Sequence, residues 1–205
     1  MPTVPTQPQP KPLVNIANFP EKTPGGRGYL ECVEENKHLH VTCIIDDFVD
    51  ATDNYLELQH LLFNAKEDDV FDILIYSYGG WVESGIELIH AFANTKAKVT
   101  TTVYGMCASI AAVIWCCGHV RRIAPSGVVM FHMPSGGNFG KTADIEEETH
   151  QIQEYFSYLL AKITKGILTK EQIQRIVVNR RDTYITADKL AGVSGVELIS
   201  KEENA

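Results

Sequence analysis

A serine set among small residues is the side chain of this sequence best suited to nucleophilic chemistry. Ser109 lies in the stretch Gly105-Met106-Cys107-Ala108-Ser109-Ile110-Ala111-Ala112, after a β-rich run and at the start of an apolar segment. A hydroxyl at a strand-to-helix turn can face a substrate, and the N–H groups that open the helix can hold a developing negative charge. Because such segments more often contain a serine that only packs, residues elsewhere in the chain must decide its role.

Acyl transfer through a serine also needs a base, an acid that orients the base, and donors for the oxyanion. His132 directly follows a predicted strand, and Met133-Pro134 behind it favours an extended exit that holds the imidazole at the sheet edge. Gly79-Gly80 follows another predicted strand, where glycines let backbone N–H groups approach a ligand. Asp182 lies between cationic residues and a short β-like segment, which fits either a surface ion pair or an orienting acid.

The other histidines and the cysteines point to no metal site and no cofactor. Most of the six other histidines lack a partner motif, and the pair His38 and His40 lacks a third ligand nearby. The five cysteines are odd in number, form no C-x-x-C pair and include the neighbours Cys116 and Cys117. We therefore expect buried free thiols in a reducing compartment.

The elements that must position these residues alternate between strand and helix. We expect strands at residues 39–45, 71–76, 98–104 and 128–131, and helices at 51–64, 83–93 and 109–117. This order predicts an α/β fold with a parallel sheet and right-handed crossovers. Sites in such sheets form at the C-terminal ends of the strands, so Gly79-Gly80, Ser109 and His132 can meet at one edge.

The C-terminal third carries one long amphipathic helix, expected from residue 142 to about residue 165. Its apolar positions Ile145, Ile152, Phe156, Leu159 and Ile163 form one stripe. At 1.5 Å per residue this helix is about 36 Å long, which exceeds what one small sheet needs. The stripe either packs on its own domain or faces another subunit. A capping box at Thr169-Lys170-Glu171-Gln172 opens the next helix.

Composition limits the class of protein and of partner. The 205 residues are 44% hydrophobic and carry a net charge of −8, which fits a single globular domain, expected at residues 29–205. The prolines of residues 1–12 and the loop-like stretch Thr23-Pro24-Gly25-Gly26-Arg27-Gly28 predict a flexible Pro/Gly-rich segment at residues 1–28. The acidic balance argues against nucleic-acid binding. No apolar run reaches the roughly 18 residues of a membrane span, and no secretory signal is visible, so we expect a cytoplasmic protein without a membrane partner.

Between residues 29 and 199, the chain resembles the proteolytic subunit of the Clp protease, a serine peptidase. The resemblance rests on six motifs that are loose singly and specific together: Ile44-Ile45-Asp46-Asp47, Tyr76-Ser77-Tyr78-Gly79-Gly80, Gly105-Met106-Cys107-Ala108-Ser109-Ile110, Met130-Phe131-His132-Met133-Pro134, Gly140-Lys141-Thr142-Ala143-Asp144-Ile145 and Arg181-Asp182-Thr183-Tyr184-Ile185-Thr186-Ala187.

The resemblance implies a fold, a set of roles and an assembly. It makes Ser109 the nucleophile, His132 the general base and Asp182 its orienting acid, with the backbone N–H groups of Gly80 and Ile110 as the oxyanion hole. It implies a crotonase-like α/β unit whose protruding long helix is a handle between two heptameric rings. The resulting tetradecamer would enclose the sites and receive peptides or unfolded proteins from an AAA+ unfoldase.

The chain departs from the family pattern in places, and other functions stay open. The family usually has Ser-Pro-Gly-Gly where this chain has Ser77-Tyr78-Gly79-Gly80, and the Pro-rich N-terminal segment does not resemble the family's axial loop. One alternative is a non-catalytic structural subunit of a Clp-like ring, and another is a viral capsid-maturation protease of the same fold. A crotonase-type acyl-CoA enzyme would share the fold, but a serine–histidine pair is unexpected there.

Overall fold

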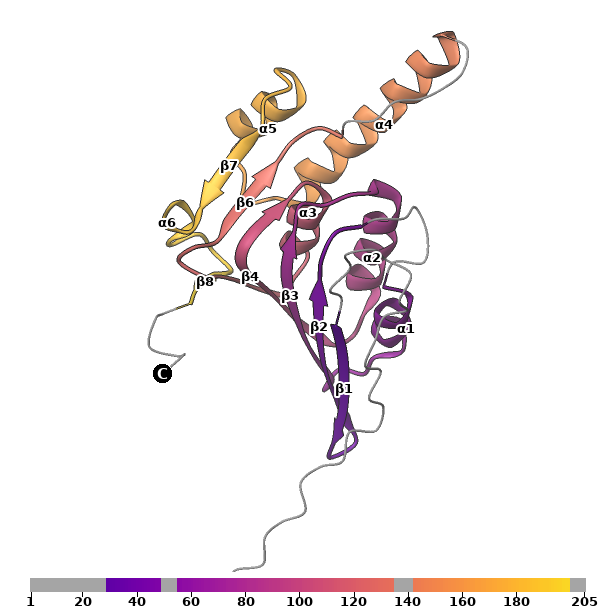
Figure 1. Ribbon diagram of the computed structural model, residues 1–205, viewed down its shortest axis with the longest axis vertical. Helices are drawn as coiled ribbons and strands as arrows, with labels where there is room; N and C mark the ends of the chain where they lie inside the picture. The colour runs from indigo at the N-terminus through magenta and orange to yellow at the C-terminus, as the bar shows by residue number, and fades with distance from the viewer. Residues whose placement is uncertain (1–28, 49–54, 135–141, 200–205) are drawn as a thin grey trace, which may run out of the picture.

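Strands and helices alternate along the chain in the computed structural model, which describes residues 29–48, 55–134 and 142–199. The strands of this part form one sheet (Figure 1). They are β1 (Tyr29–Glu35), β2 (His38–Ile45), β3 (Val70–Ser77), β4 (Lys98–Ala108), β5 (Val120–Ile123), β6 (Val128–Phe131), β7 (Thr183–Thr186) and β8 (Val196–Leu198). The helices are α1 (Leu56–Asn64), α2 (Val82–Asn94), α3 (Ile110–Cys116), α4 (Thr142–Ile163), α5 (Lys170–Val177) and α6 (Ala187–Leu190).

The sheet is parallel at its centre and antiparallel at two margins. Its main path runs β1-β2-β3-β4-β5-β8, with β6 added to β4 and β7 added to β6. Pairing is parallel throughout except between β1 and β2 and between β6 and β7. The expected parallel-rich α/β fold is therefore confirmed as a mixed sheet flanked by helices. Asn36 and Lys37 join β1 to β2 with φ of 53° and 71°, the left-handed conformations that a two-residue hairpin turn requires.

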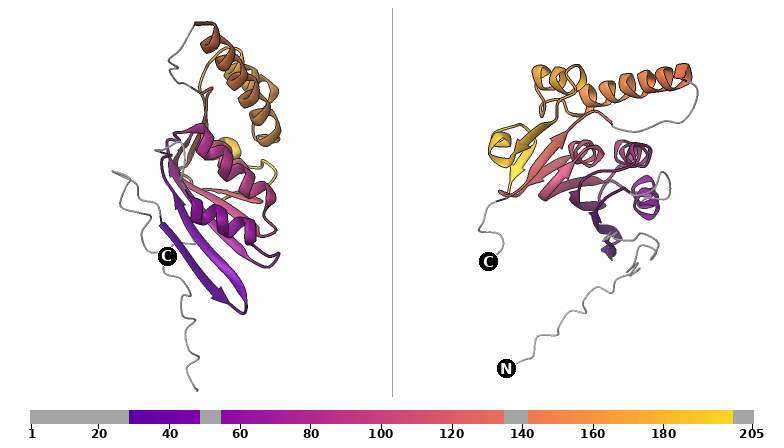
Figure 2. Two further views of the ribbon diagram at one scale, coloured as in Figure 1. Left: turned by 90° about the vertical axis from the view of Figure 1, so that its right-hand side faces the viewer. Right: turned by 45° about the horizontal axis from the view of Figure 1, so that its top comes forward.

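One face of the sheet is covered by α1, α2 and α3, and this layer contains the core (Figure 2). Alternate residues of β3 point to that layer, and Phe71, Ile73 and Ile75 are buried. The strand periodicity of two fixes which residues face the helices. Helix α3 is buried along its whole length, because it packs between α2 and the strands. The site residue Ser109 is thus joined to the most buried helix of the fold.

Element boundaries differ from the sequence expectations in two places that matter for the site. The helix expected at residues 51–64 begins at Leu56, because Tyr55 has a left-handed φ of 60° and cannot be its first turn; residues 51–54 lie outside the described residues. The helix expected at 109–117 begins at Ile110, with Ser109 as a non-helical N-cap residue. The strand expected at 98–104 continues to Ala108, so β4 leads directly into Ser109.

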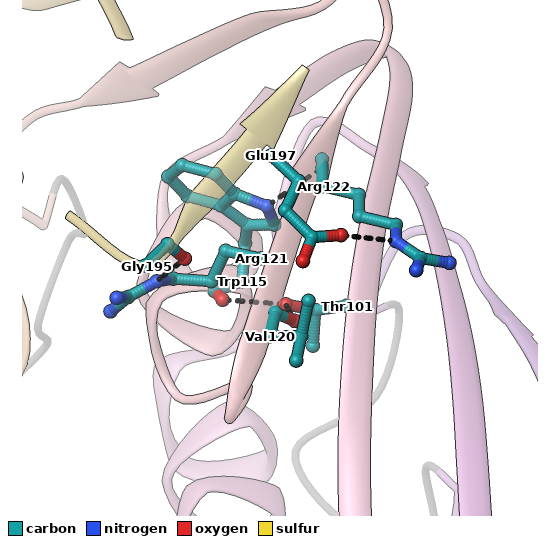
Figure 3. A network of polar contacts seen from close by, with 7 residues as sticks. All are labelled: Thr101, Trp115, Val120, Arg121, Arg122, Gly195 and Glu197. Carbon is teal, nitrogen blue, oxygen red and sulfur yellow. Dashed lines mark hydrogen bonds and ion pairs between the residues drawn. The ribbon is translucent and has the colours of Figure 1, made fainter. Parts of the chain in front are cut away.

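A polar network fixes the far end of α3 against the strands (Figure 3). The indole N–H of Trp115 donates to the carbonyl of Arg122 at 3.1 Å, and Thr101 Oγ1 donates to the Trp115 carbonyl at 2.8 Å. Arg122 also pairs with Glu197 of β8 at 2.8 Å, and Arg121 Nε donates to the Gly195 carbonyl at 3.0 Å. These contacts join α3, β5 and the C-terminal strand into one unit.

Helix α4 extends away from the sheet, and its N-terminal end is the part farthest from it (Figures 1 and 2). Its C-terminal half packs on the domain, where Phe156, Leu159 and Leu160 are buried. The side chains of Ile145 and Ile152, expected in the same stripe, lie outside the described part. The predicted capping box at α5 is confirmed, since Gln172 N donates to Thr169 Oγ1 at 3.2 Å and Thr169 N donates to Gln172 Oε1 at 2.8 Å.

Candidate active site

Ser109 lies at a sharp turn between the end of β4 and the start of α3. Its φ of 58° and ψ of −129° are rarely adopted by a residue other than glycine, and such strain concentrates at functional sites. The turn is held because Ser109 N donates to the Met130 carbonyl of β6 at 2.9 Å. The Ser109 side chain makes no capping hydrogen bond to α3, so its hydroxyl is available for another partner.

That partner is His132, the first residue after β6. Strands β4 and β6 run parallel in the register Ala108↔Met130, so their C-terminal ends lie side by side. Nε2 of His132 lies 2.8 Å from Oγ of Ser109, within the range for proton transfer between a nucleophile and a base. Both side chains are half-buried, which leaves the pair reachable from outside. The structure therefore brings together the two residues that the sequence singled out from separate strands.

Asp182 directly precedes β7, and no hydrogen bond of the described residues joins it to the Ser109–His132 pair. Strands β6 and β7 are antiparallel with Phe131 opposite Thr183, so continuing the register by one residue places Asp182 opposite His132. Residues directly opposite in such a pair have Cβ atoms about 4.5–5.5 Å apart. Among the described residues, no hydrogen bond or ion pair joins the Asp182 carboxylate to the His132 ring, and Asp182 is exposed.

The glycine pair after β3 packs directly on Ser109. Gly79 has φ of 100°, and a Cβ added to it would lie 2.7 Å from Ser109 Cβ and 3.3 Å from Ser109 Oγ. Gly80 has φ of 135°, and a Cβ there would overlap the Phe48 carbonyl oxygen. Both positions thus require glycine, for conformation and for space. This close approach places the turn beside the hydroxyl of Ser109.

Two backbone N–H groups at this point are not used by the fold. Within the described residues, neither Gly80 N nor Ile110 N donates a backbone hydrogen bond. Ile110 is the first residue of α3, so its N–H has no helical acceptor. A glycine in α2, Gly85, lets Ile110 pack against that helix, because a Cβ there would overlap Ile110 Cγ1. Free donors beside a hydroxyl are what an oxyanion site consists of.

Sequence reasoning gave no role to two residues that support the site, Asp47 and Ser77. Asp47 Oδ1 accepts hydrogen bonds from Ser77 Oγ at 3.1 Å and from Tyr78 N at 2.6 Å. An acidic residue just after a buried strand is a weak signal on its own. It gains meaning only through the parallel pairing of β2 with β3, which places the ends of the two strands together.

Cys107, two residues before Ser109, is poorly suited to act as a nucleophile. Burial raises the pKa of its thiol far above the ordinary value, so the thiol stays protonated at neutral pH. Burial likewise raises the pKa of Cys117 to about 12. All five cysteines are free, and four of them are buried, which confirms the expectation of buried thiols for those four.

The described residues contain neither a metal-binding cluster nor a membrane-spanning helix. There, no three His, Cys, Asp or Glu side chains lie close enough together to hold a metal ion. In the same residues, no helix has both the length and the apolar character needed to cross a membrane.

Comparison with known proteins identifies the family of the chain. The family model described as Clp protease matches residues 36–194. The chain is similar to the ATP-dependent Clp protease proteolytic subunits of Dehalococcoides mccartyi strains BAV1 and CBDB1. It is 30% identical to each over 155 residues, which cover 73% of this chain and 76% of each relative. The matched region contains the Ser109–His132 pair, the Gly79-Gly80 turn and Asp182. Because the family model matches more than half of the chain, the chain belongs to the Clp protease family.

Proposed function

We propose that this protein is a serine endopeptidase that hydrolyses peptides or unfolded proteins. The observation that carries the proposal is the 2.8 Å separation of Ser109 Oγ and His132 Nε2 at a strained strand-to-helix turn. Family membership supports peptidase chemistry at this pair. The unused N–H groups of Gly80 and Ile110 supply the donors that acyl transfer requires.

The proposed reaction has two steps. His132 Nε2 accepts the proton of Ser109 Oγ as the oxygen attacks the scissile carbonyl, and the N–H groups of Gly80 and Ile110 bind the resulting oxyanion. His132 then gives the proton to the leaving amine, which leaves an acyl group on Ser109. Water activated by His132 releases that group in the second step. Exposed Tyr78 and Trp81 flank the glycine turn and offer apolar surface to substrate side chains.

Asp182 is proposed as the acid that orients the His132 ring. His132 follows β6 and Asp182 precedes β7 at the end of the ladder where Phe131 pairs with Thr183. If that register continues by one residue, a side-chain rotation can bring the carboxylate to the second ring nitrogen. In that arrangement the carboxylate stabilises the imidazolium formed during attack. The absent hydrogen bond in this structure is the one observation that favours the alternative, a non-catalytic subunit of a Clp-like ring.

The assembly proposed for this chain is two heptameric rings stacked as a tetradecamer in the cytoplasm, working with an AAA+ unfoldase. The length of α4 and its extension from the sheet support a contact between subunits, as do the exposed rings of Tyr155 and Tyr158. Light scattering after gel filtration tests the assembly, and a monomer would contradict it.

Labelling with a fluorophosphonate, together with a fluorogenic peptide assay, tests the catalytic assignment. The wild type is expected to react, and both Ser109→Ala and His132→Ala are expected to lose labelling and peptide turnover. His132→Ala removes the base without touching the nucleophile, so it separates the pair from a merely accessible serine. If the assembled wild type neither labels nor cleaves, the structural-subunit alternative holds instead.

A further inference from the structure

The turn that carries Gly80 is held by residues 46–48, here termed the brace. One oxygen of the Asp47 carboxylate accepts hydrogen bonds from Tyr78 N at 2.6 Å and from Ser77 Oγ at 3.1 Å. Ser77 Oγ in turn accepts a hydrogen bond from Gly79 N at 3.0 Å. Asp47 therefore fixes three consecutive residues of the turn, two directly and the third through one buried hydroxyl.

The backbone of the brace closes the turn from the other side. Phe48 N donates to the Gly79 carbonyl at 2.7 Å, and the Phe48 carbonyl accepts from Trp81 N at 3.0 Å. Gly80 lies between these two hydrogen bonds, and its own N–H donates to no backbone acceptor in the described residues. The brace thus forms hydrogen bonds with the Gly79 carbonyl and the Trp81 N–H on either side of Gly80. The Gly80 N–H, which we propose binds the oxyanion, has no backbone acceptor in the described residues.

The brace is itself anchored in the core. Phe48 is buried, and its ring meets the ring of Tyr55 edge-on at a centroid distance of 5.2 Å. The Tyr55 hydroxyl accepts from Asp46 N at 2.8 Å and lies 2.7 Å from the Asp46 carboxylate. Burial, and then the charge of Asp46, raise the pKa of Tyr55, so the hydroxyl remains a donor. The brace, and through it the Gly79-Gly80 turn, is therefore attached to the buried core at Phe48 and Tyr55.

We propose that Asp47 is a positioning residue that aims the Gly80 N–H at the oxyanion. This inference rests on the proposed peptidase function. An oxyanion donor stabilises the transition state only when its direction is fixed before the reaction. Asp47 touches neither the nucleophile nor the base in the described hydrogen bonds, and it acts through Tyr78 and Ser77. Its contribution is that of a hydrogen-bond acceptor, which an amide oxygen at the same position can also provide.

The experiment compares Asp47→Ala and Asp47→Asn with the wild type in the full-length protein. Because Asp47 is exposed, water can satisfy Tyr78 N in the alanine variant, and we expect the chain to fold. Loss of aim at one donor is expected to lower kcat roughly 10- to 100-fold while KM changes by less than about twofold. The asparagine variant is expected to recover most of this loss. The fluorophosphonate labelling rate should fall in parallel with kcat.

A matched control is Asp68→Ala, which removes an exposed carboxylate that has no contact with the turn among the described hydrogen bonds. It should retain the wild-type kcat. If Asp47→Ala does not fold, Ser77→Ala tests the same path, because it removes the link to Gly79 N and should also lower kcat rather than raise KM.

The outcomes separate this inference from the proposed function. Wild-type kcat in Asp47→Ala, or equal losses in Asp47→Ala and Asp47→Asn, would overturn the positioning role while leaving Ser109 as nucleophile. A fall in melting temperature with unchanged kcat would do the same, since it shows a structural role only. A wild type that neither labels nor cleaves would overturn both the peptidase function and the positioning role.

Discussion

Replacing Gly79 with alanine tests whether the glycine turn sets the position of Ser109, the proposed nucleophile. Gly79 has φ of 100°, and the new Cβ would lie 2.7 Å from Ser109 Cβ and 2.9 Å from the Ala108 carbonyl oxygen. The Ala108 oxygen is a backbone atom and Ser109 Cβ is bonded directly to the backbone, so neither can rotate away as the end of a long side chain would. The turn or the Ser109 segment must therefore move.

The size of that movement follows from the same distances. Ordinary contact begins at 3.4 Å, so relief of the 2.7 Å approach needs a shift of about 0.7 Å. The Ser109 Oγ to His132 Nε2 distance is 2.8 Å, and a shift of this size along it would exceed hydrogen-bond reach. Since a misplacement of about 1 Å costs about 100-fold in rate, we expect kcat to fall roughly 10- to 100-fold.

Gly166→Ala is the matched control. Gly166 has φ of 87°, and a Cβ there would have nothing within 4 Å, so its variant carries the backbone strain without the collision. Each variant should lose about 1–2 kcal/mol of stability from the left-handed conformation alone. Peptide turnover and urea unfolding measured on both separate the two effects. Equal turnover in Gly79→Ala and Gly166→Ala would refute the placement of the turn against Ser109.

Three further predictions concern stability. Thr183→Val should raise the free energy of unfolding by about 1 kcal/mol, because Thr183 Oγ1 is buried with no hydrogen-bond partner in the described residues; a loss in urea unfolding would contradict this. Trp115→Phe should lower the free energy of unfolding by about 1–3 kcal/mol, since it leaves the Arg122 carbonyl without the indole donor. Glu197→Gln, at the exposed ion pair with Arg122, should lower it by less than about 1 kcal/mol. If thermal unfolding gave the reverse order, it would contradict the contacts in Figure 3. Burial raises the pKa of the Cys107 thiol in the folded protein, whereas the thiol of the unfolded chain ionises near pH 9.0. The folded state is therefore not penalised by this thiol below pH 9, and the free energy of unfolding falls as the pH rises above 9, where only the unfolded chain loses the proton. Between pH 8 and pH 10 the wild type should therefore lose about 1 kcal/mol more stability than Cys107→Ala, and identical losses would count against a buried neutral thiol.

Sequence patterns predicted the central part of the fold and less of its margins. Apolar runs at β2, β3, β4 and β6 marked buried strands, because strands covered on a face need such residues. Strands β1, β5 and β8 were not predicted. The strands β5 and β8 are short, and charged residues interrupt the apolar pattern of β1 and, through Arg121 and Arg122, of β5. The helix start at Leu56 was misplaced because it depends on the left-handed conformation of Tyr55, which is stabilised by distant contacts with Asp46 and Phe48.

The sequence also identified some residues of the candidate site and not others. The sequence singled out Ser109, His132 and Gly79-Gly80, because each follows a strand and each has a residue type that the chemistry needs. It placed Asp47 in one of the motifs that resemble the family but assigned no role to it, since an aspartate after a strand has many uses. Nor could it place the Asp182 side chain, whose rotamer depends on neighbours across the β6–β7 pair.

The sequence by itself determined the identity and order of the chemical groups, the strand ends that carry them and the glycines that a tight approach demands. These features depend on local backbone preferences and on periodicity, which neighbouring residues encode. Only the tertiary structure decided that Ser109 Oγ and His132 Nε2 lie 2.8 Å apart, that Gly79 packs on Ser109 and that Asp47 holds the turn. Those distances depend on the pairing of β2 with β3 and of β4 with β6, and strand pairing between distant segments is set by burial of a common core.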